Sequence, residues 1–250
     1  MDILFTICGR AGSKGIHNKN LRRFCNKYLL YYSVAVIDLY LAKHPEIDYD
    51  LVVNSDSMEL LRLAAVNGML EIEQIVRNES LAGDTVGKID VIRNCLEIMQ
   101  DRKHKYYNMV VDLDITSPLR RVRDLEKVIA LQNETKADVV TTVATARRNP
   151  YFNQIKRTEH GFRKVIESKY TARQQAPEIF DMNASIYAYN PTHLFSGKAV
   201  LDGYVEAVEM YDTGILDLDH ENDFDLMEVI AGYLFRKEKD FQEVYAHVPV

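Results

Sequence analysis

The chain has 250 residues, of which 47% are hydrophobic and 27% are charged, and its formal net charge at pH 7 is −6. This composition is typical of a folded globular protein; it argues against a general nucleic-acid binder, and no apolar run is long enough to span a bilayer. The three cysteines lack zinc-motif spacing and the N-terminal apolar run is too short for a signal peptide, so a cytoplasmic protein is expected.

The first part of the chain alternates short apolar runs with longer segments of helical spacing. The expected strands are residues 2–8, 50–54, 71–76, 109–113 and 138–144, and the expected helices are residues 29–42, 58–67, 88–100 and 122–132. Such alternation predicts a parallel sheet with right-handed crossovers and helices on both faces. The expected fold class is therefore α/β, a three-layer α/β/α Rossmann-like arrangement with a mostly parallel sheet.

Residues 147–182 break this alternation. They are polar, carry Pro150 and Pro177, and contain short β-like pieces at residues 151–155 and 162–166. They are expected to form a small inserted arm within a single domain that spans residues 1–250. Strands are expected again at residues 185–189 and 205–211, followed by a last long helix at residues 221–236.

The loop at residues 10–20 is the strongest candidate for a ligand site. Its small residues, Gly9, Gly12 and Gly15, let the backbone approach a ligand closely. Three cations stand beside them and would neutralise negative charge on a ligand: Arg10, Lys14 and Lys19. The loop falls at the carboxyl end of a parallel strand, where such sheets bind ligands, so a triphosphate site is favoured over a solvated basic turn. It is not a Walker A sequence, because the glycine spacing and the trailing Gly-Lys-Ser/Thr are absent.

Five segments resemble, in the same order, motifs of the CMP-sialic acid synthetase family, the cytidylyltransferases that activate sialic acids and related nine-carbon 2-keto acids. They are Arg10-Ala-Gly-Ser-Lys-Gly with Lys19-Asn20, Asn78-Glu-Ser-Leu-Ala-Gly-Asp84-Thr85, Thr116-Ser-Pro-Leu-Arg120, Asn183-Ala-Ser-Ile-Tyr187 and Asp217-Leu-Asp219. Within the family, residues 147–153 and 181–185 look most like the branch that acts on diacetylated legionaminic acid.

The resemblance implies a nucleotidyltransferase that joins CTP and a nonulosonic acid into a CMP-sugar, releases pyrophosphate and uses Mg²⁺. Lys14 and Arg10 would neutralise charge on the triphosphate and the departing pyrophosphate, and Asp217 and Asp219 would hold the Mg²⁺. Further nucleotide contacts would fall on Ser13, Lys19, Asn20, Arg77, Ser80 and Asp84, and sugar contacts on Thr116, Arg173, Gln174, Asn183 and Tyr187. The family also uses the arm to form a homodimer in which each subunit reaches toward its partner's site.

Plainer alternatives stay open for several of these residues. Arg77, Ser80 and Asp84 are nearly as well suited to a solvated loop. The alternative for Arg173 is that it only makes its loop soluble. Tyr187 is also suited to packing on a strand, and the segment from Asp217 to Asp223 to a solvated acidic turn.

Asp114 departs from the family pattern, in which most sialic acid enzymes carry Gln-Pro where this chain has Asp114-Ile115. An ionised Asp only accepts hydrogen bonds, so Asp114 is expected to select a substrate donor such as an acetamido N–H. A diacetylated 5,7-diamino sugar fits that preference better than plain sialic acid. Two alternatives are that Asp112 and Asp114 are metal ligands, or that Asp114 pairs with Arg120 or Arg173.

Two other classes of function compete with the cytidylyltransferase. Asp112-Leu-Asp114 follows an expected strand, as does the metal-binding Asp-x-Asp of many nucleotide-sugar glycosyltransferases. That motif is not normally accompanied by an N-terminal Gly-Ser-Lys-Gly loop. A nucleotide-sugar sensor without turnover is the third class, and the retention of Lys14, Asp217 and Asp219 argues against it.

Overall fold

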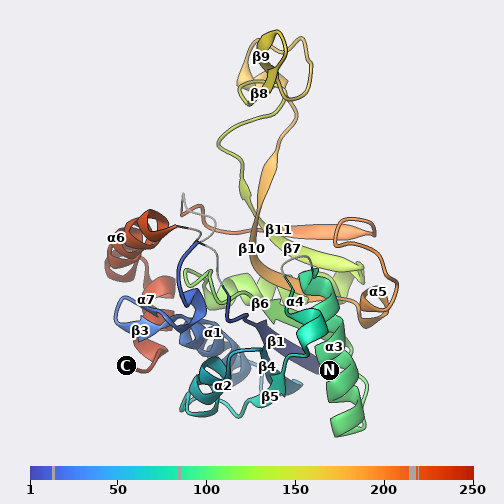
Figure 1. The fold of residues 1–250 in the computed structure, drawn as a ribbon, viewed down its shortest axis with the longest axis vertical. Coiled ribbons are helices and arrows are strands. Elements are labelled where there is room, and N and C mark those ends of the chain that lie inside the picture. Colours follow the sequence, from blue (N-terminus) through green and yellow to red (C-terminus); the bar gives the residue numbers. More distant parts are fainter. Residues whose placement is uncertain (13–14, 84–85, 214–217, 219) are drawn as a thin grey trace.

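The computed structural model describes residues 1–12, 15–83, 86–213, 218 and 220–250. Within them, seven strands form one sheet in the order β11-β7-β10-β6-β1-β4-β5. Their bounds are β1 Asp2–Cys8, β4 Asp48–Ser55, β5 Glu73–Val76, β6 Met109–Leu113, β7 Val139–Thr145, β10 Phe180–Tyr189 and β11 Val205–Glu209. In this sheet β10 is antiparallel to β6 and β7 and the other pairs are parallel, which confirms the mostly parallel sheet (Figure 1).

Helices cover both faces of the sheet, as predicted for three layers. One face carries α1 (Leu29–Lys43), α2 (Met58–Ala65), α4 (Val122–Thr135), α6 (Glu221–Lys237) and α7 (Lys239–His247), and the other carries α3 (Lys88–Lys103) and α5 (Pro191–Leu194). β1 connects the two halves of the core because successive side chains of a strand point to opposite faces. Ile3, Phe5 and Ile7 pack into one buried cluster and Leu4 into the other.

The predicted helix at residues 58–67 has the N-cap expected from its sequence. The Ser57 hydroxyl oxygen accepts a hydrogen bond from the Leu60 amide at 3.2 Å. The helix itself ends at Ala65, and Gly68 follows in the left-handed region with φ of 74°.

The helix α7 was not predicted, because it follows α6 after the single residue Glu238, with no glycine or proline to mark a boundary. Its C-terminus is held from a distant part of the chain. Lys27, on β3 (Lys27–Tyr28) of a small hairpin with β2 (Arg23–Phe24), donates from Nζ to the carbonyls of Tyr245 and Val248, at 2.6 Å each. A cation at a helix C-terminus is favourable, and only the tertiary fold brings this one there.

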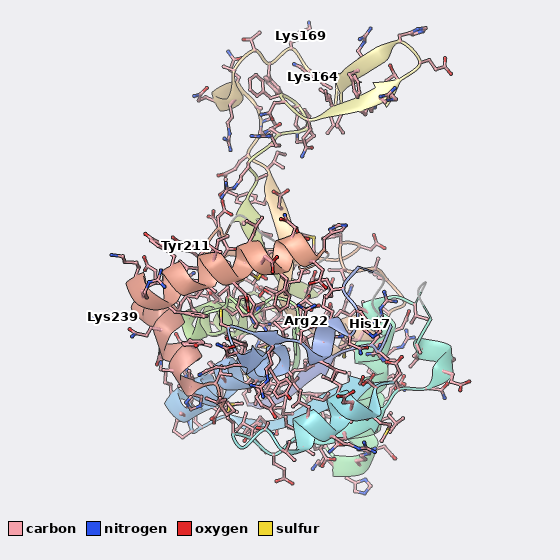
Figure 2. All side chains as sticks on the ribbon, turned by 60° about the vertical axis from the view of Figure 1, so that its left-hand side comes forward. His17, Arg22, Lys164, Lys169, Tyr211 and Lys239 are labelled. Carbon is pink, nitrogen blue, oxygen red and sulfur yellow. The ribbon has the colours of Figure 1, made fainter. Side chains whose placement is uncertain are left out.

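The segment predicted as an arm stands away from the sheet as a hairpin of β8 (Ile155–Thr158) and β9 (Gly161–Lys164) (Figure 1). Figure 2 shows Lys164 and Lys169 at its far end, whereas Tyr211 and Lys239 lie on the body of the molecule. The β-like piece predicted at residues 162–166 is confirmed in its first part, because β9 covers residues 161–164, whereas the piece predicted at residues 151–155 is wrong in position. Residues 151–154 form a turn instead, because the Asn149 carbonyl accepts hydrogen bonds from the amides of Phe152, Asn153 and Gln154.

Two predicted strand boundaries also need correction. β10 begins at Phe180 rather than at residue 185, because residues 180–182 pair with residues 143–145 of β7 inside the segment predicted as arm. β11 ends at Glu209 rather than at residue 211, where its pairing with β7 stops. In the described part of the chain, no helix has the length and apolar character needed to cross a membrane.

Candidate active site

A cavity of about 350 Å³ opens at the carboxyl end of the sheet, within the size range of small-molecule sites. This strand-end cavity is lined by Cys8, Arg10, Lys19, Asn20, Arg77, Leu81, Gly83, Val86, Lys88, Val91, Asp114 and Thr116. Four of these side chains are cationic and one is acidic, in a chain whose net charge is −6. The cavity therefore suits a polyanionic ligand.

The structure brings six of the predicted site residues together in the strand-end cavity: Arg10, Lys19, Asn20, Arg77, Asp114 and Thr116. Ser80 is exposed and is not among the lining residues; its hydroxyl donates to the Asn78 side chain at 3.0 Å. Ser13, Lys14, Asp84, Asp217 and Asp219 lie outside the described residues, so their predicted roles stay predictions.

The remaining predicted sugar contacts lie elsewhere in this chain. Arg173 and Gln174 line a separate cavity of about 300 Å³ at residues 145–149 and 173–179, and one guanidinium nitrogen of Arg173 donates to the Ala146 carbonyl at 2.8 Å. Asn183 is buried and lines a third, small cavity. Tyr187 is half-buried on β10 and stacks on Tyr189, with ring centroids 5.9 Å apart.

Close packing fixes the start of the glycine-rich loop. A Cβ at Gly9 would lie 2.5 Å from Leu60 Cδ2 and 2.8 Å from Ile115 Cδ1, so any larger residue would have to displace these two buried side chains. The next turn is held by hydrogen bonds: the Ala11 amide donates to Asp56 Oδ1 at 2.7 Å, and Asn20 Nδ2 donates to the Arg10 carbonyl at 3.0 Å. The Ala11 amide is thus bonded to a carboxylate here.

Arg77 is a buried cation on one wall of the cavity. It follows β5 and lies beside the end of β4, where its Nε donates to Asn54 Oδ1 at 2.7 Å and Nη2 to the Asn54 carbonyl at 3.1 Å. These two bonds fix the plane of the guanidinium group. Its Nη1 has no partner among the described residues, so it is available to a ligand.

Lys19 connects the loop to the segment that carries the predicted metal pair. Its Nζ donates to the Leu218 carbonyl at 2.6 Å, and the Leu218 side chain is fully buried in the core. Leu218 stands between Asp217 and Asp219 in the sequence. The residue at the centre of the Asp-x-Asp sequence is therefore anchored beside a cation that lines the strand-end cavity.

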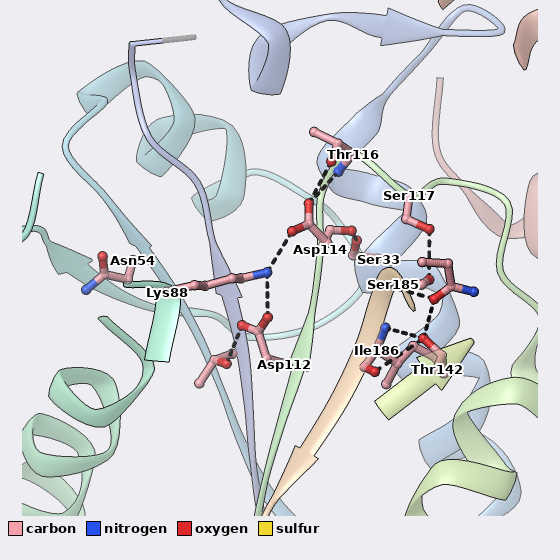
Figure 3. Close-up of polar contacts among 12 residues, drawn as sticks. Ser33, Asn54, Lys88, Asp112, Asp114, Thr116, Ser117, Thr142, Ser185 and Ile186 are labelled. Carbon is pink, nitrogen blue, oxygen red and sulfur yellow. Dashed lines mark hydrogen bonds and ion pairs between the residues drawn. The ribbon is translucent and has the colours of Figure 1, made fainter. Parts of the chain in front are cut away.

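Lys88 extends between Asp112 and Asp114 at the end of β6 (Figure 3). Its Nζ lies 2.7 Å from Asp112 Oδ2 and 2.7 Å from Asp114 Oδ2. Asp112 is fully buried, and its Oδ1 accepts a hydrogen bond from Thr6 Oγ1 at 2.7 Å. Asp114 Oδ1 accepts from the Thr116 amide at 2.9 Å and from the Thr116 hydroxyl at 2.8 Å.

The ion pairs set the charge of this cluster. Burial works to raise the pKa of Asp114, but the charge of Lys88 and hydrogen bonds from Lys88 and Thr116 outweigh it and lower that pKa to about 2. Burial works to lower the pKa of Lys88, and Asp112 and Asp114 outweigh it, so that pKa is raised well above its usual range. Both groups are thus charged at neutral pH.

Arg120 has a different role from the one considered in the sequence. It is fully buried, and it donates to the backbone carbonyls of Asp114 at 2.7 Å and Ser185 at 2.9 Å and to the Ser33 hydroxyl. It thereby joins α1, β10 and the turn after β6. The alternative that Asp114 pairs with Arg120 or Arg173 has the wrong partner, because Lys88 reaches the carboxylate from α3.

The Asn183-Ala-Ser-Ile-Tyr187 segment is a bulge in β10, where the pairing with β7 shifts between Met182 and Tyr187. Ala184 has a φ of 51°, in the left-handed region. Asn183 Oδ1 holds the bulge by accepting from the Thr142 hydroxyl at 2.6 Å and the Ser185 amide at 3.2 Å. The Ser185 hydroxyl in turn accepts from Ser117 at 2.8 Å, which links the bulge to the Thr-Ser-Pro-Leu-Arg turn (Figure 3).

Lys88 and Asn54 were not among the predicted site residues. A lysine at the first position of a helix is unfavourable beside the helix dipole, and that was a readable signal that Lys88 has another role. Asn54 had no comparable signal, because a polar residue at a strand end is common.

Three comparisons with known proteins agree with this geometry. Residues 4–241 match the sequence profile of a family described as cytidylyltransferase. The chain is 34% identical to post-translational flagellin modification protein B of Campylobacter coli, over 96% of this chain and 99% of that protein. It is 32% identical to the CMP-N,N'-diacetyllegionaminic acid synthase of Campylobacter jejuni, again over 96% of this chain and 99% of that protein.

A solved structure of CMP:2-keto-3-deoxy-manno-octonic acid synthetase with CTP has the same fold. Its TM-score is 0.63 at 15% identity, covering 93% of this chain and 99% of that one. The profile match spans nearly the whole chain, and the two Campylobacter relatives named above are matched over nearly their full length. The chain belongs to the cytidylyltransferase family.

Proposed function

We propose that the chain transfers CMP from CTP to the anomeric hydroxyl of a nonulosonic acid, with N,N'-diacetyllegionaminic acid as its preferred acceptor. The observation that carries the transfer is the strand-end cavity, whose cations Arg10, Lys19 and Arg77 converge at the carboxyl ends of the strands. The name of the Campylobacter jejuni relative supports the choice of acid.

The reaction needs positioning and charge neutralisation rather than covalent chemistry by the protein. The anomeric hydroxyl oxygen attacks the α-phosphorus and loses its proton to water, a new O–P bond forms, and the bond to the bridging oxygen of the departing pyrophosphate breaks. Arg10, Lys14 and Lys19 would neutralise the charge that accumulates on the leaving group. Ser13 and Asn20 would add hydrogen bonds to the phosphates, and Arg77 and Asp84 are assigned to further contacts with the nucleotide. Ser80 does not line the strand-end cavity and is given no role.

Mg²⁺ is the proposed cofactor, held by Asp217 and Asp219. Two carboxylates separated by one residue supply the hard oxygen ligands that Mg²⁺ prefers. The anchoring of Leu218 by Lys19 fits this assignment, because it ties the segment to a cation of the strand-end cavity. When bound, the ion would neutralise phosphate oxygens there.

A homodimer is proposed from the surface of the arm. Ile155 and Phe162 are 60% and 54% exposed, and they share one face of the hairpin because Ile155 pairs with Lys164 and Arg157 with Phe162. A two-stranded hairpin is barely stable alone, and two exposed apolar side chains on one of its faces, beside Arg157 and Lys164, favour contact with a partner surface. A second copy of the chain would cover it and bring Arg173 and Gln174 toward the acid in the partner's cavity.

A glycosyltransferase that binds its metal at Asp112 and Asp114 fits the structure poorly. The space between the two carboxylates holds the Lys88 ammonium group. That placement favours nucleotidyl transfer over sugar transfer for this chain.

The acceptor preference is tested by measuring pyrophosphate release in reactions that contain CTP, Mg²⁺ and one acid from a panel of nonulosonic acids. We expect the highest kcat/KM with N,N'-diacetyllegionaminic acid and at least tenfold less with N-acetylneuraminic acid, since one mismatched buried hydrogen bond costs about 1–3 kcal/mol. Reactions without an acid control for CTP hydrolysis. Equal or higher kcat/KM with N-acetylneuraminic acid would reject the proposed preference.

A further inference from the structure

Lys88 has no role in the function proposed above, although its side chain lines the strand-end cavity. It is the first residue of α3, where the helix dipole disfavours a positive charge. Helix stability therefore does not explain a lysine at this position. The contacts of the Lys88 ammonium group with Asp112 and Asp114 at the end of β6 explain it.

The Lys88 ammonium group lies where a metal ion would bind. Asp112 and Asp114 form an Asp-x-Asp pair at a strand end, a donor set of the kind that binds divalent cations. Lys88 Nζ lies 2.7 Å from one oxygen of each carboxylate. A metal ion that bridged these two oxygens would have to occupy the same space, so the two cations exclude each other.

The ammonium group also retains a donor for a ligand. It carries three N–H groups, and within the described ranges its partners are Asp112 and Asp114 alone. The side chain is 33% exposed and faces the same cavity as Arg10 and Arg77. One N–H therefore remains for an oxygen atom of a molecule bound in the cavity.

We propose that Lys88 is a built-in cation of this site: it takes the place of a metal ion between Asp112 and Asp114 and donates its remaining N–H to a substrate oxygen. The ammonium group of Lys88 thus supplies a positive charge in place of a second divalent ion. Because this charge is attached to the chain, it cannot dissociate from the site. The inference rests on the proposed function only for the identity of the substrates. The same donor serves an oxygen of the nucleoside or of the sugar acid, and the kinetic test below separates the two.

The first test measures Mn²⁺ binding without substrates, by the electron paramagnetic resonance signal of free Mn²⁺. The background protein carries Asp217→Asn and Asp219→Asn, which removes the proposed Mg²⁺ ligands. Adding Lys88→Ala should create one new Mn²⁺ site per chain, and adding Asp114→Asn to that protein should remove it. A folded Lys88→Ala protein that gains no Mn²⁺ would overturn the inference.

A second comparison does not depend on the folding of Lys88→Ala. It uses the background protein with Lys88 intact, with and without Asp114→Asn. We expect Asp114→Asn to leave Mn²⁺ binding unchanged, because Lys88 already fills the site. Mn²⁺ binding that is lost with Asp114→Asn would show that a metal ion binds there despite Lys88, and the inference would fail.

The kinetic test compares Lys88→Met/Asp112→Asn with the matched control Asp112→Asn. The double variant leaves the net charge of the cluster as in wild type, and the control keeps the ammonium group. Loss of a charged donor should raise the KM of one substrate about tenfold to hundredfold, CTP if the oxygen belongs to the nucleoside and the acid if it belongs to the sugar. Unchanged KM values for both substrates would contradict the donor role.

The outcomes for this inference and for the proposed function can be told apart. Mn²⁺ binding is measured without turnover, so its result does not depend on which substrates the protein uses. Wild-type protein that releases no pyrophosphate with any acid would reject the proposed function, while the Mn²⁺ results would still decide the metal-replacement role of Lys88.

Discussion

Arg77 and Lys88 are both cations of the strand-end cavity, but their surroundings give them different tasks. Arg77 is held by neutral oxygens of Asn54, so its positive charge is not cancelled locally. Lys88 lies between two carboxylates, which outweigh its positive charge and hold it in place. An anionic ligand should therefore be attracted mainly by Arg77 together with Arg10 and Lys19.

Lys14 is the cation expected to act most strongly in the transition state. It belongs to the glycine-rich loop, and charge moves toward the leaving pyrophosphate during the reaction. We expect Lys14→Ala to lower kcat by about two to three orders of magnitude, as for the loss of one oxyanion donor. Steady-state kinetics with CTP would measure this, with Lys43→Ala, an exposed lysine at the end of α1, as control. Near-normal kcat in Lys14→Ala would remove the loop from the catalytic account.

The ion pair of Asp114 makes a prediction about pH. Its pKa of about 2 in the folded protein lies below the value of about 3.9 in an unfolded chain. The stabilisation is therefore complete above about pH 4 and is lost as the pH falls toward 2, a difference of about 2 kcal/mol.

Urea unfolding between pH 2 and pH 5 would measure this difference against Asp114→Asn, which has no carboxyl group at that position to titrate. The free energy of unfolding of wild type should fall by about 2 kcal/mol more than that of the variant over this range. Parallel curves for the two proteins would mean that the Lys88–Asp114 pair does not stabilise the fold.

At the scale of secondary-structure elements, the bulge in β10 is strained at Ala184. A non-glycine residue in the left-handed region costs about 1–2 kcal/mol, whereas glycine has no such cost but loses more chain entropy on folding. Ala184→Gly should therefore stabilise the protein by about 0.5–1 kcal/mol. Ala188→Gly, on the same strand but at a regularly paired position, should destabilise it. Urea unfolding would decide, and destabilisation by Ala184→Gly would contradict the assigned strain.

The arm can be removed cleanly at the point where β7 and β10 separate. The Ala146 amide donates to the Ile179 carbonyl at 2.9 Å, so replacing residues 147–178 with a short glycine-serine turn preserves the sheet pairing of residues 180–182. We expect this variant to be monomeric by light scattering and to lose binding of the acid, because Arg173 and Gln174 leave with the arm. A dimer that persists without the arm would show that the interface lies elsewhere.

The limits of sequence prediction are clear at this scale. The strands β1 and β6 were placed to the residue because a fully buried parallel strand is a short apolar run with defined ends. The start of β10 and the position of β8 were not, because polar strands that extend from the sheet lack such a pattern. Their positions depend on pairing partners that the sequence does not reveal.

For the whole molecule, the site could be predicted only as far as its motifs extend. Six predicted residues meet in the strand-end cavity because the loops after parallel strands converge at one edge of the sheet. The partner of Asp114 was not predictable, since Lys88 is 26 residues away in sequence and reaches it through the packing of α3 on the sheet. Arg120 shows the same limit, because its buried partners come from α1, β10 and the turn after β6.

The central claim is that one chain binds CTP in the strand-end cavity and passes its CMP unit to a nonulosonic acid. The most direct measurement uses CTP that carries ³²P at either the α or the γ position. After reaction with Mg²⁺ and N,N'-diacetyllegionaminic acid, the ³²P in the sugar product and in pyrophosphate is measured. We predict that α-labelled CTP puts the label on the sugar and that γ-labelled CTP puts it only in pyrophosphate. A sugar that stays unlabelled with α-labelled CTP would contradict the account.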